Sequence, residues 1–444
     1  MVTDRGAGMR LYGNATMAVL VALGFSGGTP NLVATSIVPA WTSVIGWEVE
    51  AIGYLSLLQL PYALKFLWAP CVDRVALPLQ RRLGRRRAWI LWSQLACVVM
   101  MTALGAWGPV GGEPSWASHA SIFAVLLTVL TFVSATQDIV ADAFRTESLE
   151  PGQLGAGAGV FVSGYRVAFV ALGAAALALA PKFGWEMVLL GVAVVALACS
   201  LGTLSATEPA VRAPPEPGLR AAVVAPFASL WNRWGIRVLA LVAFVLLFRL
   251  PDQLGNAMTP PLLLKGLAYS PETLGWVRQG FGFGLTIAGA LVGGWMVARW
   301  GIIRCLVVFG ILQALSNGGF LLIAEAFNAS TEIARSAPPP IAPLVGTIAI
   351  ENFVGGLVSA GFVAFLMSVC DRQQVATQYA LLTALMAASG AIGGALSGLL
   401  ARAFDYPGFY LLTILAGVPG MALVPFIRLP ACQDLRNAPA SSDF

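Results

Sequence analysis

Charged side chains are scarce in this sequence: aspartate, glutamate, lysine and arginine make up only 11% of its 444 residues. Soluble domains carry about 25%. The polar surface that a water-soluble globule needs is therefore missing, which excludes soluble enzymes. Only three lysines occur, Lys65, Lys182 and Lys265, and none follows a glycine as the lysine of a phosphate-binding loop does. A built-in ATP motor of the usual kind is thus excluded, and energy must come from a gradient or from another subunit.

Histidine and paired cysteines are almost absent as well. His119 is the single histidine, and the six cysteines are scattered singly with no Cys-x-x-Cys spacing. Neither a disulfide framework nor a zinc site is indicated. The clustered His and acidic ligands of a membrane-embedded metalloenzyme are missing too. We therefore expect no enzyme, no catalytic residues, and no metal or other cofactor beyond a coupling proton.

Apolar residues are abundant, at 58% of the chain. A helix that spans a bilayer needs roughly 20 consecutive apolar residues. Twelve charge-poor runs of about this length predict an all-α polytopic membrane protein with 12 transmembrane helices. They lie at about 14–40, 51–72, 88–108, 119–143, 157–180, 184–204, 236–263, 272–298, 302–327, 342–369, 376–401 and 408–428.

The basic residues are distributed unevenly over the loops between these runs. With the N-terminus inside, 18 of the 26 fall in cytoplasmic segments and four in outer loops. Because arginine and lysine are enriched in cytoplasmic loops, this predicts that both termini are cytoplasmic. Outer loops instead carry glutamates.

An internal repeat divides the chain into two halves. Glu50-Ala51-Ile52-Gly53-Tyr54 corresponds to Glu272-Thr273-Leu274-Gly275-Trp276, and further matches follow at nearly the same offset. Such a parallel repeat is typical of major facilitator transporters, which bind substrate between the halves. We expect six-helix halves at 1–204 and 236–444. The proline-rich cytoplasmic linker 205–235 ends in a sequence of helical periodicity, as in a helix on the membrane surface.

A basic loop with an aspartate at its start follows the second run. Asp73-Arg74 with Gly84-Arg85-Arg86-Arg87 resembles the major facilitator loop between the second and third helices, and the segment around Arg299 resembles its copy in the second half. In that family the carboxylate and arginines hold the inner helix ends together. We expect gating by Asp73, Arg74, Arg145 and Arg299, although the arginines could serve topology alone.

The fourth run carries two acids. Ser134, Asp138, Asp142 and Arg145 share one helix face by their spacing. Carboxylates one turn apart repel each other, and burial disfavours the charged form, so one of them can take up and release a proton. Alternatively, Asp142 simply pairs with Arg145. Glu351 in the tenth run is a second candidate for proton coupling.

The remaining charges inside the runs are candidates for the substrate. Arg249 and Asp252 could pair locally, while Lys65, Arg166 and Arg278 could neutralise the acids or hold a substrate carboxylate. The full set expected at the substrate is Lys65, Tyr62, Arg166, Gln137, Arg249, Asp252, Arg278, Asn352, Gln378 and Tyr379.

Specific strings resemble one branch of the major facilitators, the AmpG-type muropeptide permeases. They include Pro61-Tyr62-Ala63-Leu64-Lys65-Phe66-Leu67-Trp68, Ala135-Thr136-Gln137-Asp138-Ile139-Val140-Ala141-Asp142, Gly164-Tyr165-Arg166, Glu351-Asn352 and Ala376-Thr377-Gln378-Tyr379. The strings run from the second to the eleventh predicted helix.

This resemblance implies proton-driven import of GlcNAc-1,6-anhydro-MurNAc peptides across the bacterial inner membrane, for peptidoglycan recycling and β-lactam resistance. The implied partners are this anionic substrate and membrane lipids, without nucleic acid, and the protein is expected to be a monomer. Siderophore importers and acetyl-coenzyme A transporters share two of these strings, the one that begins at Pro61-Tyr62 and the one that contains Gln137-Asp138, so import of a siderophore or another anionic solute remains an alternative.

Overall fold

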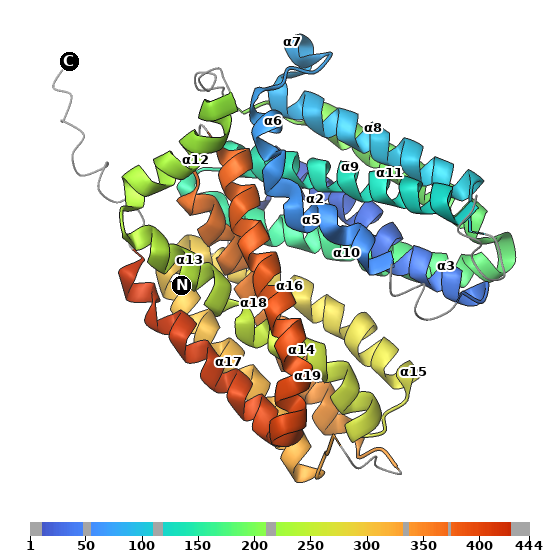
Figure 1. The fold of residues 1–444 in the computed structure, drawn as a ribbon, viewed down its shortest axis with the longest axis vertical. Helices are drawn as coiled ribbons and strands as arrows, with labels where there is room; N and C mark the ends of the chain where they lie inside the picture. The colour runs from blue at the N-terminus through green and yellow to red at the C-terminus, as the bar shows by residue number, and fades with distance from the viewer. Residues whose placement is uncertain are drawn as a thin grey trace.

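The computed structural model describes residues 11–47, 55–109, 119–209, 219–331, 337–371 and 374–427, and these are helical with no strand among them (Figure 1). Ten helices in these ranges are long and apolar enough to cross a membrane. The prediction of an all-α polytopic protein is confirmed.

The first half begins with a bent crossing, α2 (Ala15–Leu32), η1 (Val33–Ile37) and α3 (Val38–Val44). The segment expected to form the second crossing, called the second crossing below, consists of η2 (Leu55–Gln59), α5 (Leu60–Leu64), η3 (Lys65–Leu67) and α6 (Ala69–Arg74). After these come α7 (Gln80–Leu83), α8 (Arg85–Ala106), α9 (His119–Ser148), η4 (Pro151–Gln153), α10 (Leu154–Phe183) and α11 (Trp185–Ser205).

The second half follows α12 (Leu219–Trp234), the helix within the predicted linker. It contains α13 (Arg237–Phe248), α14 (Leu250–Pro261), η5 (Leu262–Gly266), α15 (Pro271–Leu274), η6 (Gly275–Phe281) and α16 (Gly282–Trp300). The last elements are α17 (Ile302–Ala326), α18 (Ile341–Val369), α19 (Val375–Ala422) and η7 (Val424–Phe426). The backbone of Asp405, at φ 54°, breaks α19 into two arms.

The second crossing differs from the single run expected at 51–72. Its helical pieces are short, and Pro61 and Pro70 each stand in the first turn of a new piece. Proline lacks a backbone N–H and clashes with the preceding turn, so a continuous helix cannot pass through these positions. The interruption puts Lys65 at the start of η3, where the backbone leaves α5.

All twelve predicted runs contain helix. The two arms of α19 correspond to two runs, and 55–74 corresponds to another. Residues 51–54 of the second run, residue 428 of the twelfth run and the tail 429–444 lie outside the described residues. The number of crossings, the side of the termini and the division at 205–235 stay predictions.

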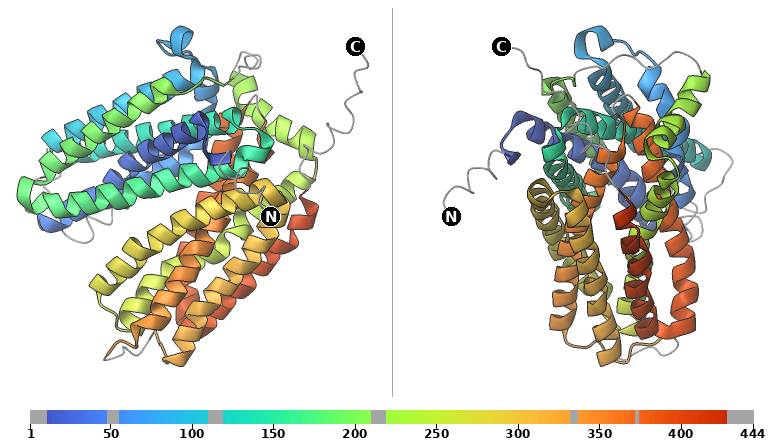
Figure 2. Two further views of the ribbon diagram at one scale, coloured as in Figure 1. Left: turned by 180° about the vertical axis from the view of Figure 1, so that it is seen from behind. Right: turned by 90° about the vertical axis from the view of Figure 1, so that its left-hand side faces the viewer.

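The two halves form separate helix bundles that meet at one end (Figure 2). We call the end that carries α6, α12 and the start of α19 the closed end, and the end that carries α3 and α15 the open end.

The contact between the halves includes α10 packed on α16, and glycine is required at two positions of α10. A Cβ at Gly159 would lie 2.4 Å from the carbonyl oxygen of Ala290, and one at Gly155 would lie 2.7 Å from that of Gly294. Small residues allow such close backbone approach between membrane helices.

Candidate functional site

A cavity of about 780 Å³ lies between the two halves. From the first half it is lined by residues of α2, η1, α3, α10 and α11, and from the second by residues of α14 and η6 to α18. Its size falls in the usual range for ligand pockets, about 300–1,000 Å³. Six residues expected at the substrate or the proton site line it: Arg166, Arg249, Asp252, Arg278, Glu351 and Asn352.

The three arginines of the cavity have different partners. Arg249 forms an ion pair with Asp252 one turn later, 3.0 Å between nitrogen and oxygen, as the spacing predicted. Arg278 donates to the amide oxygen of Asn256 at 3.1 Å. The guanidinium of Arg166 lies over the ring of Phe283, 5.2 Å from its centre. With two acids against three arginines, the lining carries one excess positive charge when all five are ionised, which suits an anionic ligand.

The side-chain amide of Asn352 holds Glu351 in place. The Asn352 side chain donates to the Glu351 carboxylate at 2.8 Å and to the carbonyl oxygen of Ile348 at 3.0 Å. The amide oxygen of Asn352 accepts from Thr286 at 3.1 Å. This chain of hydrogen bonds links α16 to α18 and fixes one oxygen of the acid.

A second cluster of charges is buried in the first half, away from the lining of the cavity. The Lys65 ammonium forms a hydrogen-bonded ion pair with Asp138 and lies 3.9 Å from Asp142. Asp142 also accepts from Arg145 at 2.6 Å. Two cations and two anions thus balance one another. The face predicted for α9 is confirmed, since its polar side chains turn toward the broken second crossing, where Tyr62 bonds Ser134 at 2.5 Å.

The Arg145 guanidinium connects this cluster to the second half. It donates to the Tyr379 hydroxyl at 2.8 Å and lies 4.3 Å from the centre of the Phe161 ring. Tyr379 is 3% exposed and is not among the residues that line the cavity. A residue expected at the substrate therefore lies in the contact between α9 and α19.

The two glutamines expected at the substrate, Gln378 and Gln137, also lie outside the cavity lining. Gln378 is fully buried, accepts from Arg233 of α12 at 3.1 Å and donates to the Pro226 carbonyl oxygen at 3.1 Å. Gln137 donates to Ser26 at 3.0 Å inside the first half. In this conformation both side chains bind other parts of the protein.

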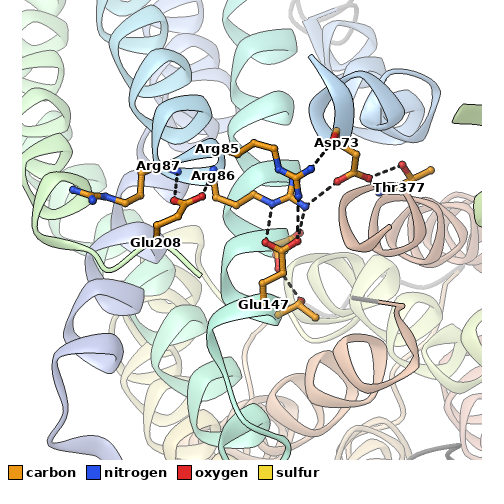
Figure 3. A network of polar contacts seen from close by, with 9 residues as sticks. Asp73, Arg85, Arg86, Arg87, Glu147, Glu208 and Thr377 are labelled. Atoms are coloured by element: carbon orange, nitrogen blue, oxygen red, sulfur yellow. Dashed lines mark hydrogen bonds and ion pairs between the residues drawn. The ribbon is translucent and has the colours of Figure 1, made fainter. Parts of the chain in front are cut away.

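At the closed end the Asp73 carboxylate joins the halves (Figure 3). One oxygen accepts from Arg86 at 2.8 Å, and the other accepts from the hydroxyl and the backbone N–H of Thr377, at 3.0 and 3.2 Å. Arg86 also binds Glu147 through two nitrogens, at 2.5 and 2.9 Å. Because Thr377 lies in the first turn of α19, separation of the halves at this end must break the bonds to Asp73.

Glu208 stabilises the same region from the start of the linker. Its carboxylate accepts from the backbone N–H groups of Arg86 and Arg87, at 2.8 and 3.0 Å (Figure 3). The first N–H groups of a helix have no partner within the helix itself, so Glu208 satisfies two of them in α8. Its negative charge at this end also interacts favourably with the helix dipole. The linker is thereby attached to the helix that carries Arg86.

The remaining predicted gate residues are Arg74 and Arg299. Arg74 is half-buried at the end of α6, beside Asp73. Arg299 is exposed, with its guanidinium 5.9 Å from the centre of the Trp295 ring. The position before Arg299 is Ala298, so the second half lacks the carboxylate that Asp73 supplies in the first.

Sequence reasoning did not identify Glu147, Glu208 and Thr377. Each meets its partner only through the fold. Thr377 stood in one of the strings that carry the family resemblance, but nothing in that string indicated a bond to Asp73. Among the described residues no group of three or more His, Cys, Asp and Glu side chains could hold a metal ion.

Comparison with known proteins gives consistent results. The family model "Major Facilitator Superfamily" matches residues 15–331. The chain is 34% identical over 421 residues to the anhydromuropeptide permease of Escherichia coli, covering 95% of this chain and 81% of that protein. It is 32% identical to an uncharacterized protein of Haemophilus influenzae, covering 91% and 92%. Its fold resembles the human organic anion transporter MFSD10, with a TM-score of 0.66 at 16% identity, covering 92% and 99%.

Proposed function

The chain belongs to the Major Facilitator Superfamily and is a multi-pass protein of the bacterial inner membrane, and we propose that it imports anhydromuropeptides by alternating access, driven by the proton gradient. The observation that carries this proposal is the similarity to an anhydromuropeptide permease along 95% of the chain. The cavity and the buried acids support it further.

The cavity has the properties that such a substrate requires. Anhydromuropeptides combine a disaccharide with a peptide that carries carboxylates, so they are large and anionic. The cavity of about 780 Å³ has an excess of one arginine over its acids. Trp276, 52% exposed, offers a flat aromatic face of the kind that packs against sugar rings.

The cluster at Lys65 is suited to carry the proton. The Asp138 side chain is 27% exposed while that of Lys65 is 6% exposed, so the acid is the more accessible partner of the ion pair and the one that a proton can reach. Protonation of Asp138 leaves the Lys65 ammonium with Asp142 as its remaining anionic neighbour, which strengthens the competition between Lys65 and Arg145 for that acid. We propose Asp138 as the main proton carrier, with Asp142 in the same cluster.

Arg145 then transmits the change to the closed end. Its guanidinium binds both Asp142 and Tyr379, so a shift in the first contact alters the second, which holds α9 to α19. We take the closed end to be cytoplasmic, as the arginine distribution predicts. The conformation is then open to the outside, and import requires that the bonds of Asp73 and Arg145 to α19 break together.

Transport into proteoliposomes tests the proposal. Purified protein is reconstituted, and uptake of labelled anhydromuropeptide is measured with and without an inward proton gradient, with a protonophore and protein-free vesicles as controls. We expect accumulation above the external concentration only when the gradient is present. Absence of uptake under a working gradient would contradict the proposed substrate, and uptake that ignores the gradient would contradict the coupling.

A further inference from the structure

Of the five charged side chains that line the cavity, two form an ion pair with each other and three contact uncharged groups. Arg249 and Asp252 form an ion pair with each other. Arg166 contacts an aromatic ring, Arg278 an amide oxygen, and Glu351 an amide nitrogen. Within the part of the chain that the structure describes, no ion pair includes any of these last three side chains.

Unpaired charges of both signs in one membrane cavity call for a physical reason. A charge inside the membrane is costly, and proteins usually pair such groups with each other or direct them toward a substrate or ion. Here the cavity holds unpaired cations and an unpaired acid at the same time, but no ion pair joins them. Pairing for stability alone does not explain this arrangement, whereas a ligand with both charges would neutralise both sets.

The acid is positioned for a ligand. The second carboxylate oxygen of Glu351 has no hydrogen-bond donor among the described residues, while the first is fixed by Asn352. Asn352 is itself fixed by Thr286 and by the backbone of its own helix. A carboxylate held on one side and open to the cavity on the other is a suitable acceptor for an ammonium group.

The arginines are placed on both halves. Arg166 comes from α10 and Arg278 from η6, while Glu351 comes from α18. A ligand that binds Arg166 together with Glu351 therefore contacts both bundles. Arginine presents a fork of N–H donors that matches a carboxylate, which gives the anionic end of the ligand its site.

We propose that the cavity binds a zwitterionic group, with an ammonium on Glu351 and a carboxylate on Arg166 and Arg278. The inference rests on the proposed function, in which the ligand's peptide end supplies both charges through a diamino acid. It gives Glu351 a role in selecting the substrate, in place of the proton coupling expected from the sequence.

Two matched ligands test this. One is a GlcNAc-anhydro-MurNAc peptide that ends in a diamino acid, and the other has the side-chain ammonium replaced by a neutral hydroxyl. Binding to the purified full chain in lipid nanodiscs is titrated at neutral pH for the wild type, Glu351→Gln, Glu351→Asp and Arg166→Gln. Glu325→Gln is the matched control, since Glu325 is exposed at the end of α17 and does not line the cavity.

A hydrogen bond between charged groups corresponds to roughly tenfold or more in affinity. We expect wild type and Glu325→Gln to prefer the ammonium ligand by that factor. Glu351→Gln should bind both ligands as the wild type binds the hydroxyl ligand, and Glu351→Asp should recover part of the preference. Arg166→Gln should weaken both ligands equally, because both carry the carboxylate.

Other outcomes separate the two proposals. If the wild type binds both ligands equally, or if the preference survives in Glu351→Gln, the zwitterion site is wrong while the proposed function stands. If Glu351→Gln weakens both ligands alike, the acid does not select an ammonium and the inference is likewise overturned. If neither ligand binds to the wild type, the proposed substrate is wrong and the inference fails with it.

Discussion

The hydroxyl of Thr377 provides a direct test of the closed end. It donates to Asp73 at 3.0 Å across the contact between the halves, and both side chains are buried, at 6% and 4% exposure. Thr377→Val removes this hydrogen bond but keeps the shape, the β-branch and the backbone bond to Asp73 at 3.2 Å. Hydrogen bonds to charged groups contribute about 1.5–3 kcal/mol.

The bond exists only while the closed end is shut, so its loss acts on one state alone. A tenfold change in an equilibrium corresponds to about 1.4 kcal/mol, so even the lower limit of this range shifts the equilibrium between the two states about tenfold toward the inner-open state. A state that is a small minority in the wild type therefore becomes readily detectable in the variant.

Pulsed electron resonance measures the shift. Spin labels are placed at Val44 of α3 and Glu272 of α15, both exposed at the open end, in a background that lacks the six native cysteines. Because the open end closes in the inner-open state, we expect Thr377→Val to increase the population of short distances between the two labels. Thr383→Val is the control, because the Thr383 hydroxyl bonds only carbonyl oxygens of its own helix. An unchanged distribution, or an equal shift in the control, would refute the reasoning.

Three further substitutions test other parts of the account. Asp138→Asn should abolish accumulation driven by the proton gradient while exchange across equilibrated vesicles persists, and full concentrative uptake in this variant would contradict its role. Tyr379→Phe removes the hydroxyl bonded to Arg145 at 2.8 Å. Turnover, measured by transport, should fall several-fold, while substrate affinity, measured by titration, should stay unchanged. A loss confined to affinity would place Tyr379 in the substrate site. Gly159→Ala places a methyl group 2.4 Å from a carbonyl oxygen of α16 and should lower the melting temperature by several degrees. In the control Gly284→Ala the added methyl group has no neighbour within 4 Å, so this variant should melt at the temperature of the wild type. Equal melting temperatures of the two variants would refute the close packing.

The fold class could be predicted because a bilayer imposes simple requirements on a sequence. The runs at 88–108 and 342–369 correspond to α8 (Arg85–Ala106) and α18 (Ile341–Val369) within a few residues. Length and charge set those boundaries, and the repeat set the division into halves. The break around Lys65 was not predicted, although Pro61 and Pro70 were visible, because apolar composition alone says nothing of helix continuity.

The site was predictable only in part. The sequence singled out the charges inside apolar runs; five of them and the neighbouring Asn352 line the cavity, and others form the Lys65 cluster, while their roles stay predictions. Spacing along one helix also offered, as one of two alternatives, the pairs that Arg249 and Arg145 form in the structure. Contacts between helices could not be read in this way. Tyr379 and Gln378 looked like substrate residues because of their type, but their partners come from α9 and α12.

The central claim is that substrate and proton move together through one carrier. Its most direct test uses vesicles loaded with a pH indicator, with equal pH on both sides and no membrane potential, to which anhydromuropeptide is added outside. The account predicts that the interior acidifies as the substrate enters and that Asp138→Asn shows no acidification. Entry of substrate into wild-type vesicles with a constant interior pH would contradict it.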